Sequence, residues 1–154
     1  MQTTSATAAT DRSVEAPDLA VRLRLAVTRT ARRLRQEASA GLSPSQGAML
    51  ATIERHGPLT PSELAERERV QRPTVTRMLA RLEADGIVQR AADPADGRSF
   101  LVSLTPAGRE LLHEVRNRKD AYLAARLREL DEEERAALDR AATVLEHLLE
   151  GDRA

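Results

Sequence analysis

The stretch QRPTVTRMLARLEADG, residues 71–86, is the most informative part of the sequence about the fold. If a helix begins near residue 72, side chains three and four positions apart share one face. That face holds four apolar residues: Val75, Met78, Leu79 and Leu82. Arg77 points nearly the opposite way, and Gly86 can adopt the left-handed conformation that ends a helix. The stretch therefore predicts a helix with a buried aliphatic side and a cationic exposed side.

The exposed side carries small, hydroxylated and cationic residues: Pro73, Thr74, Thr76, Arg77, Ala80 and Arg81. Small residues let a helix approach another surface closely, and threonine and arginine side chains can contact base edges or phosphates. This chemistry is typical of a recognition helix in the major groove of DNA. A polar helix face is also ordinary solvated surface, so the neighbouring elements must distinguish the two interpretations.

A short helix is predicted just before this stretch. In TPSE, residues 60–63, a threonine cap, a proline at the first helical position and a glutamate three residues on form a capping box. The helix is expected to end around residues 67–70. Its N-terminal amides, with Thr60 and Ser62, could bind a phosphate. A short helix followed by a recognition helix is the order of elements in a helix-turn-helix.

A β-hairpin is predicted just after it. IVQRA, residues 87–91, and SFLVSLT, residues 99–105, have strand character, and the ADPADGR between them is rich in turn-forming residues. Such a hairpin would form a wing, with Arg98 at its tip able to enter the minor groove. Phosphate would repel Asp93 and Asp96, so one of the two is expected to orient Arg98 instead.

Longer helices flank this unit. An apolar repeat runs from Leu19 to near Gly41, SPSQ at 43–46 starts a second helix, and TPAG at 105–108 and DEEE at 131–134 start two more. The expected fold is mainly α with a small β-hairpin, a winged helix-turn-helix with flanking helices.

We assign residues 1–18 to a disordered tail, 19–42 to an N-terminal dimerisation helix, 43–105 to the DNA-binding domain and 106–150 to C-terminal dimerisation helices. The apolar stripes of the outer helices exceed what the central unit can cover. A two-fold dimer is therefore expected, with intramolecular packing as the alternative.

Composition excludes several classes of protein. The 154 residues carry no net charge and no cysteine, which removes disulfides, thiolate metal sites and thiol redox sensing. No apolar run has the length of a membrane span, and the N-terminus lacks the features of a secretory signal. A cytoplasmic location is therefore expected.

Nothing in the sequence indicates catalysis. The three histidines, His56, His113 and His147, are far apart, and no glycine-rich phosphate loop or nucleophile motif is present. No cofactor and no metal are expected. Two alternatives to a DNA-binding regulator remain: a winged-helix module that binds proteins, and a small helical hydrolase or isomerase, which lacks any candidate set of catalytic residues.

Three motifs together, RPTVTR, RLEADGIV and DPADGRSFLVSLTPAGR, resemble the winged-helix core of the MarR family (multiple antibiotic resistance regulators). The resemblance covers about residues 19–150. It implies a homodimeric transcription regulator on a pseudo-palindromic operator, most often a repressor released by a small-molecule effector. It also implies DNA contacts by Arg72, Pro73, Thr74, Thr76, Arg77 and Arg98, with Asp96 bracing the wing arginine.

Two positions depart from the family pattern. Gln71 stands where the family often has a serine cap, and glutamine is a poor N-cap. Glu68 and Arg69 occupy a turn that often contains Leu-Gly, so Arg69 is expected to add a phosphate contact.

Overall fold

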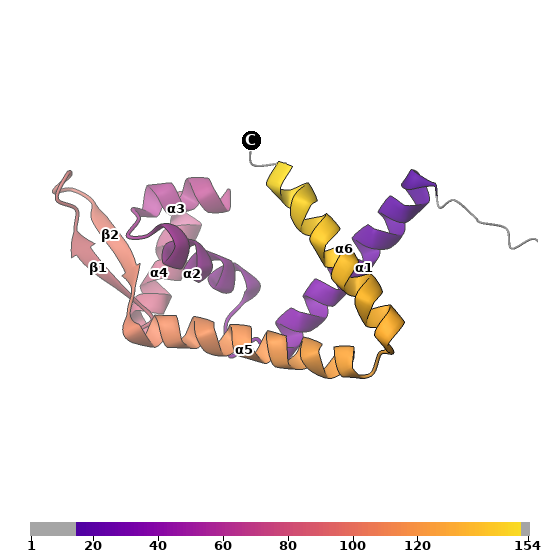
Figure 1. Cartoon of the computed structure of the whole chain (residues 1–154). Helices are drawn as coiled ribbons and strands as arrows, with labels where there is room; N and C mark the ends of the chain where they lie inside the picture. The colour runs from indigo at the N-terminus through magenta and orange to yellow at the C-terminus, as the bar shows by residue number, and fades with distance from the viewer. Residues whose placement is uncertain (1–14, 152–154) are drawn as a thin grey trace, which may run out of the picture. The chain divides into compact units, whose positions relative to one another are not determined.

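The structure is a computed structural model that describes residues 15–151. Residues 1–14, most of the predicted disordered tail, lie outside the described part. The elements, shown in Figure 1, are α1 (Ala16–Glu37), α2 (Pro44–His56), α3 (Pro61–Glu68), α4 (Arg72–Ala84), β1 (Val88–Ala92), β2 (Phe100–Leu104), α5 (Pro106–Arg128) and α6 (Glu132–Gly151). The mainly helical fold with one antiparallel hairpin is the predicted one. Among residues 15–151, the helices lack an apolar stretch of the length that a membrane span requires.

The described chain divides into two units, residues up to Arg33 and residues from Leu34 onward. Most of α1 forms the first unit, and the helix buries none of its side chains. It begins three residues before the predicted start, because a proline at position 17 is compatible with a helical first turn. It ends before Gly41, where Ala40 and Gly41 both take positive φ angles, 41° and 80°.

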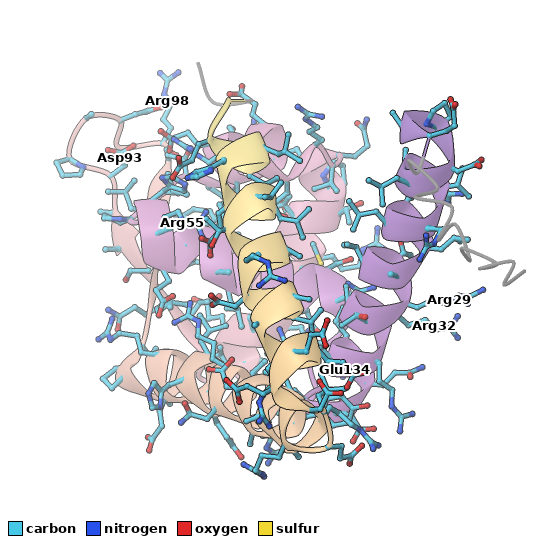
Figure 2. All side chains as sticks on the ribbon, turned by 45° about the vertical axis from the view of Figure 1, so that its right-hand side comes forward. Arg29, Arg32, Arg55, Asp93, Arg98 and Glu134 are labelled. Carbon is cyan, nitrogen blue, oxygen red and sulfur yellow. The ribbon has the colours of Figure 1, made fainter. Side chains whose placement is uncertain are left out.

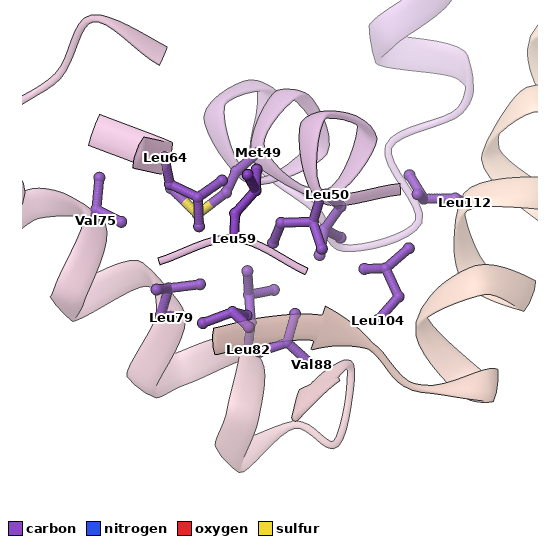
Figure 3. Packing of buried hydrophobic residues seen from close by; sticks show 12 residues of the cluster. Met49, Leu50, Leu59, Leu64, Val75, Leu79, Leu82, Val88, Leu104 and Leu112 are labelled. Carbon is purple, nitrogen blue, oxygen red and sulfur yellow. The ribbon is translucent and has the colours of Figure 1, made fainter. Parts of the chain in front are cut away.

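A single aliphatic core holds the second unit together (Figure 3). Each of the elements from α2 to α5 contributes to it: Met49, Leu50, Ile53, Leu64, Val75, Leu79, Leu82, Val88, Val102, Leu104 and Leu112. Leu59, in the segment between α2 and α3, is also buried and pairs with Val102 through two main-chain hydrogen bonds of 3.1 and 2.8 Å. This bridge attaches the middle of β2 to the segment between α2 and α3.

The predicted helix starts from α2 onward are confirmed. Ser43 and Thr60 each form a full capping box, with Gln46 and Glu63 respectively. Asp131 and Glu134 exchange the same pair of bonds at the start of α6, at 2.8 and 3.1 Å. Such caps satisfy amides that the first turn of a helix leaves without partners.

An ion pair connects α2 with α5. Both terminal nitrogens of Arg116 donate to the carboxylate of Glu54, one of them at 3.2 Å. These hydrogen bonds lower the pKa of Glu54 below its ordinary value. The pair lies at the surface beside the buried Ile53 and Leu112, so the apolar contact between the two helices is the main source of their cohesion.

The junction between the hairpin and α5 is unusually close. The Thr105 hydroxyl caps α5 by accepting from the Gly108 amide at 3.0 Å, and it lies 2.7 Å from the Gly86 carbonyl oxygen, to which it donates. A Cβ atom on Gly108 would lie 2.2 Å from the carbonyl oxygen of Ile87. Only glycine therefore fits at this position.

We predict that Gly108→Ala lowers the free energy of unfolding by about 1–3 kcal/mol, because the added methyl group forces α5 away from Ile87. Gly47→Ala in α2 is the matched control, since its Cβ would meet no atom within 4 Å. That change should raise stability by about 0.5–1 kcal/mol through helix propensity. Urea denaturation measures both. Equal effects of the two substitutions would contradict the close approach.

Candidate nucleic-acid interface

The buried side of α4 has the composition that the sequence predicts. Val75 and Leu79 are completely buried and Leu82 is 1% exposed, whereas Met78 is only half-buried. The six residues of this helix that are predicted to contact DNA are all exposed: Arg72, Pro73, Thr74, Thr76, Arg77 and Arg81. Because the aliphatic side is held in the core, the helix cannot rotate about its axis. The threonine and arginine side chains therefore remain facing outward.

The start of α4 has no side-chain cap. Gln71 is the N-cap residue, and its side chain makes no capping hydrogen bond, as its residue type predicts. The hydroxyl of Thr76, one turn further on, donates a hydrogen bond to the Arg72 carbonyl oxygen at 3.1 Å and does not cap the helix. The first turn of α4 therefore presents main-chain amides and the Arg72 side chain together at one exposed end.

At the start of α3, Thr60 forms one more hydrogen bond with Glu63 than the predicted capping box contains. The Thr60 hydroxyl accepts from the Glu63 amide at 3.2 Å and donates to the Glu63 carboxylate at 2.8 Å, and the Thr60 amide donates to the same carboxylate at 2.8 Å. The bond from the Thr60 amide is the largest cause that lowers the pKa of Glu63. Because Glu63 already engages the Thr60 hydroxyl in both directions, Ser62, half-buried in the first turn, is the better placed of the two hydroxyls for a ligand.

The turn between α3 and α4 depends on a strained residue. Arg69 caps α3 in the left-handed conformation, with φ 53° and ψ 43°, a region that residues other than glycine rarely adopt. Next to it, Glu68 accepts a hydrogen bond from the Thr52 hydroxyl of α2, which fastens the turn to the helix beneath. The unusual Glu-Arg sequence thus forms a tight turn and leaves the Arg69 side chain exposed.

The hairpin tip is ordered by its aspartates. The Asp93 carboxylate accepts from the Ala95 amide at 2.9 Å, and the Asp96 carboxylate accepts from the Arg98 amide at 3.0 Å. Asp96 therefore braces the main chain of Arg98. Within residues 15–151, no hydrogen bond or ion pair joins the Asp96 carboxylate to the Arg98 guanidinium group. Figure 2 shows Arg98 projecting from the tip above Asp93.

These elements surround one open hollow of about 460 Å³. Five of its lining residues belong to the predicted site: Thr60, Ser62, Arg72, Asp96 and Arg98. Four others complete it: Pro61, Asp93, Ser99 and Phe100. The remaining predicted contacts lie outside the hollow, on α4 and in the turn at Arg69. Phe100 was missed as a site residue, although its position as the only phenylalanine, next to the tip, could have drawn attention to it.

The described residues hold no group of histidines, aspartates and glutamates that could bind a metal ion. His56, His113 and His147 lie on three different helices, α2, α5 and α6. A capped short helix, an outward-facing threonine–arginine helix and a hairpin with an arginine at its tip together define a winged-helix DNA-binding protein.

Comparison with known proteins agrees with this class. The family model for the MarR family matches residues 42–100. A regulator from Mycobacterium bovis, named uncharacterized HTH-type transcriptional regulator Mb0904, is 43% identical over 128 residues, which cover 82% of this chain and 90% of the relative. The HTH-type transcriptional repressor MdtR of Bacillus subtilis is 38% identical over 61% of each chain. The crystal structure of a putative transcriptional regulator from Pseudomonas aeruginosa superposes with a TM-score of 0.77, at 38% identity, over 86% of this chain and 94% of that one.

The chain belongs to the MarR family of transcriptional regulators. It is a DNA-binding regulator with a winged helix, and the family and its relatives are regulators rather than enzymes.

We predict that Arg69→Gly raises the free energy of unfolding by about 1 kcal/mol, because glycine adopts the left-handed conformation without strain. Arg69→Ala is the control, since alanine removes the side chain beyond Cβ but keeps the Cβ atom that causes the strain. Thermal or urea denaturation compares them. If alanine stabilises the protein as much as glycine does, the strain at this residue is not the cause.

Proposed function

We propose that two copies of this regulator bind a pseudo-palindromic operator, each inserting α4 into the major groove and the hairpin tip into the adjacent minor groove. The observation that supports this proposal most strongly is the fixed rotation of α4. Burial of Val75 and Leu79 leaves Thr74, Thr76 and Arg77 on the outside. A helix held in this way can carry its side chains to base edges without first losing much conformational freedom.

The contacts fall into two groups in this proposal. Arg77, in the middle of the exposed side of α4, reads a base edge, while Thr74 and Thr76 contact bases or phosphates beside it. The charged and small residues around them position the helix on the backbone: Ser62, Arg69, Arg72, Pro73 and Arg81. Arg98 enters the minor groove, whose negative potential is strongest where A·T pairs narrow it. Thr60 serves mainly as the cap of α3 and so supports these contacts indirectly.

The dimer is supported by apolar side chains that the chain leaves exposed on its outer helices. On α1, Leu19, Val21, Leu25 and Val27 are 37–51% exposed, and on α6, Leu138, Val144, Leu148 and Leu149 are 49–64% exposed. Such stripes on long helices are typical of an interface between subunits. We propose that a second copy of the chain covers them.

Charge also favours self-association. Helix α1 carries six arginines, among them Arg29 and Arg32 in Figure 2, and two carboxylates. Helix α6 carries six carboxylates and two arginines. Two copies therefore bring together helices of opposite net charge, which favours their encounter and suppresses pairing of like helices.

We further propose that the regulator represses transcription and that a small molecule releases it from DNA. One of its relatives, MdtR, is a repressor by name. In vitro transcription from the promoter next to its own gene tests the first part: added protein should reduce transcript, and an increase would identify an activator instead.

We predict that Arg77→Ala weakens binding to a duplex from the upstream region of its own gene by about 1–3 kcal/mol, as expected for a bidentate base contact. Fluorescence anisotropy over a range of salt concentrations measures the affinity. Arg118→Ala on α5 removes the same charge from a pair with Glu114 and should bind nearly as the unmodified protein does. Equal affinities of both variants would remove Arg77 from the interface, and no salt-dependent complex at all would favour the protein-binding module.

We predict that Leu148→Glu separates the dimer, because it places a charge within the apolar stripe of α6. Thr143→Glu is the control, since residue 143 lies on the opposite side of the helix by its periodicity. Light scattering should give half the dimer mass for the first variant and the full dimer mass for the second. A monomeric unmodified protein, or a dimer that tolerates Leu148→Glu, would contradict the proposed interface.

A further inference from the structure

A chain of three side chains connects the recognition helix to the wing. Arg90, on β1, pairs with Glu83 in the last turn of α4, with its Nε 2.9 Å from the Glu83 carboxylate. The same guanidinium group lies over the ring of Phe100, on β2, 4.4 Å from its centroid. The Arg90 and Glu83 side chains are 30% and 40% exposed, so the pair is partly withdrawn from solvent.

The strand register explains how these groups meet. Arg90 is directly opposite Val102, and Phe100 is opposite Ala92, so Arg90 and Phe100 are diagonal neighbours on one face of the hairpin. Val102 on this face is completely buried. The stacked pair therefore extends the packed face of the hairpin from the core toward the tip.

The wing needs such support. A two-stranded hairpin is marginally stable by itself. The main-chain bridge from Leu59 reaches β2 at its middle residue, Val102, and most of the tip beyond Phe100 is exposed. Phe100 also lines the hollow that Arg72 and Arg98 share. A displacement of the ring would therefore move the wing arginine relative to the start of α4.

We propose that Glu83, Arg90 and Phe100 form a wing brace, which holds the hairpin at a fixed angle to α4 and so determines how much Arg98 contributes to DNA binding. The three are positioning residues that act through Arg98. An arginine is required at position 90, because its planar guanidinium group can stack on a ring and donate to a carboxylate at once, whereas a lysine ammonium is a point charge. This inference rests on the proposed minor-groove contact of the wing.

The sharpest test is Glu83→Gln. This change removes a negative charge, and simple electrostatics would strengthen binding to a polyanion. The brace predicts the opposite: affinity for the duplex from its own upstream region falls by about twofold to fivefold, as expected when a positioned contact loosens. Asp85→Asn, two residues further on, makes the same charge change outside the brace, and its affinity should be unchanged or slightly higher. Tighter binding by both variants would overturn the brace.

Arg90→Lys and Phe100→Leu test the other two members in combination with Arg98→Ala. When Arg98 is present, each substitution should weaken DNA binding by about threefold to tenfold. In combination with Arg98→Ala, each should have little further effect, because the effects of coupled residues on binding do not add. Circular dichroism verifies that each variant is folded. Additive losses would mean that Arg90 contacts DNA itself and would overturn the inference. If Arg98→Ala weakens binding but the brace variants do not, the brace fails and the wing contact stands. If Arg98→Ala has no effect, both fail.

Discussion

The structure depends on the burial of one side of α4. Val75, Leu79 and Leu82 pack against Met49, Leu64 and the strands in an almost entirely aliphatic core. Each fully buried side chain of this size contributes about 1.5–3 kcal/mol, so three on one helix resist any rotation that would expose them. The direction in which the exposed threonines and arginines point is thus fixed by residues that are themselves buried in the core. The packing of the buried face of α4 therefore determines which side chains its exposed face presents.

Features that depend on local sequence could be predicted. The apolar spacing in residues 71–86 gave the buried side of α4, and the capping boxes gave the starts of α2 and α3, because both depend on side chains at most a few positions apart. The hairpin followed from its turn residues. Contacts between distant positions could not be predicted in this way. The stacking of Arg90 on Phe100 is such a contact. The left-handed conformation of Arg69 and the second bond of the Thr60 hydroxyl, to the Glu63 carboxylate, are local, but they depend on backbone and side-chain geometry that residue type does not determine. The residues proposed to touch DNA were all found on the expected elements, and their contacts remain proposals.

The exposed leucines of the outer helices have a common physical explanation. Among the buried hydrophobic residues of the core in the second unit, one, Leu112, comes from the 23 residues of α5, and none comes from α6. An aliphatic stripe left in water loses the stabilisation that burial would provide. The proposed second copy would supply that burial and also a two-fold axis, which would place two recognition helices on one face of DNA.

Affinity cleavage from α4 is the most direct test of this account. The chain has no cysteine, so Ala80→Cys, an exposed position beside Arg77, gives a single attachment point for an iron chelate that generates hydroxyl radicals. On a duplex that the protein binds specifically, we expect two clusters of major-groove cuts about one helical turn, roughly 34–36 Å, apart. Cuts spread evenly along the duplex, or specific binding without any cleavage near the site, would show that this side of α4 does not face DNA.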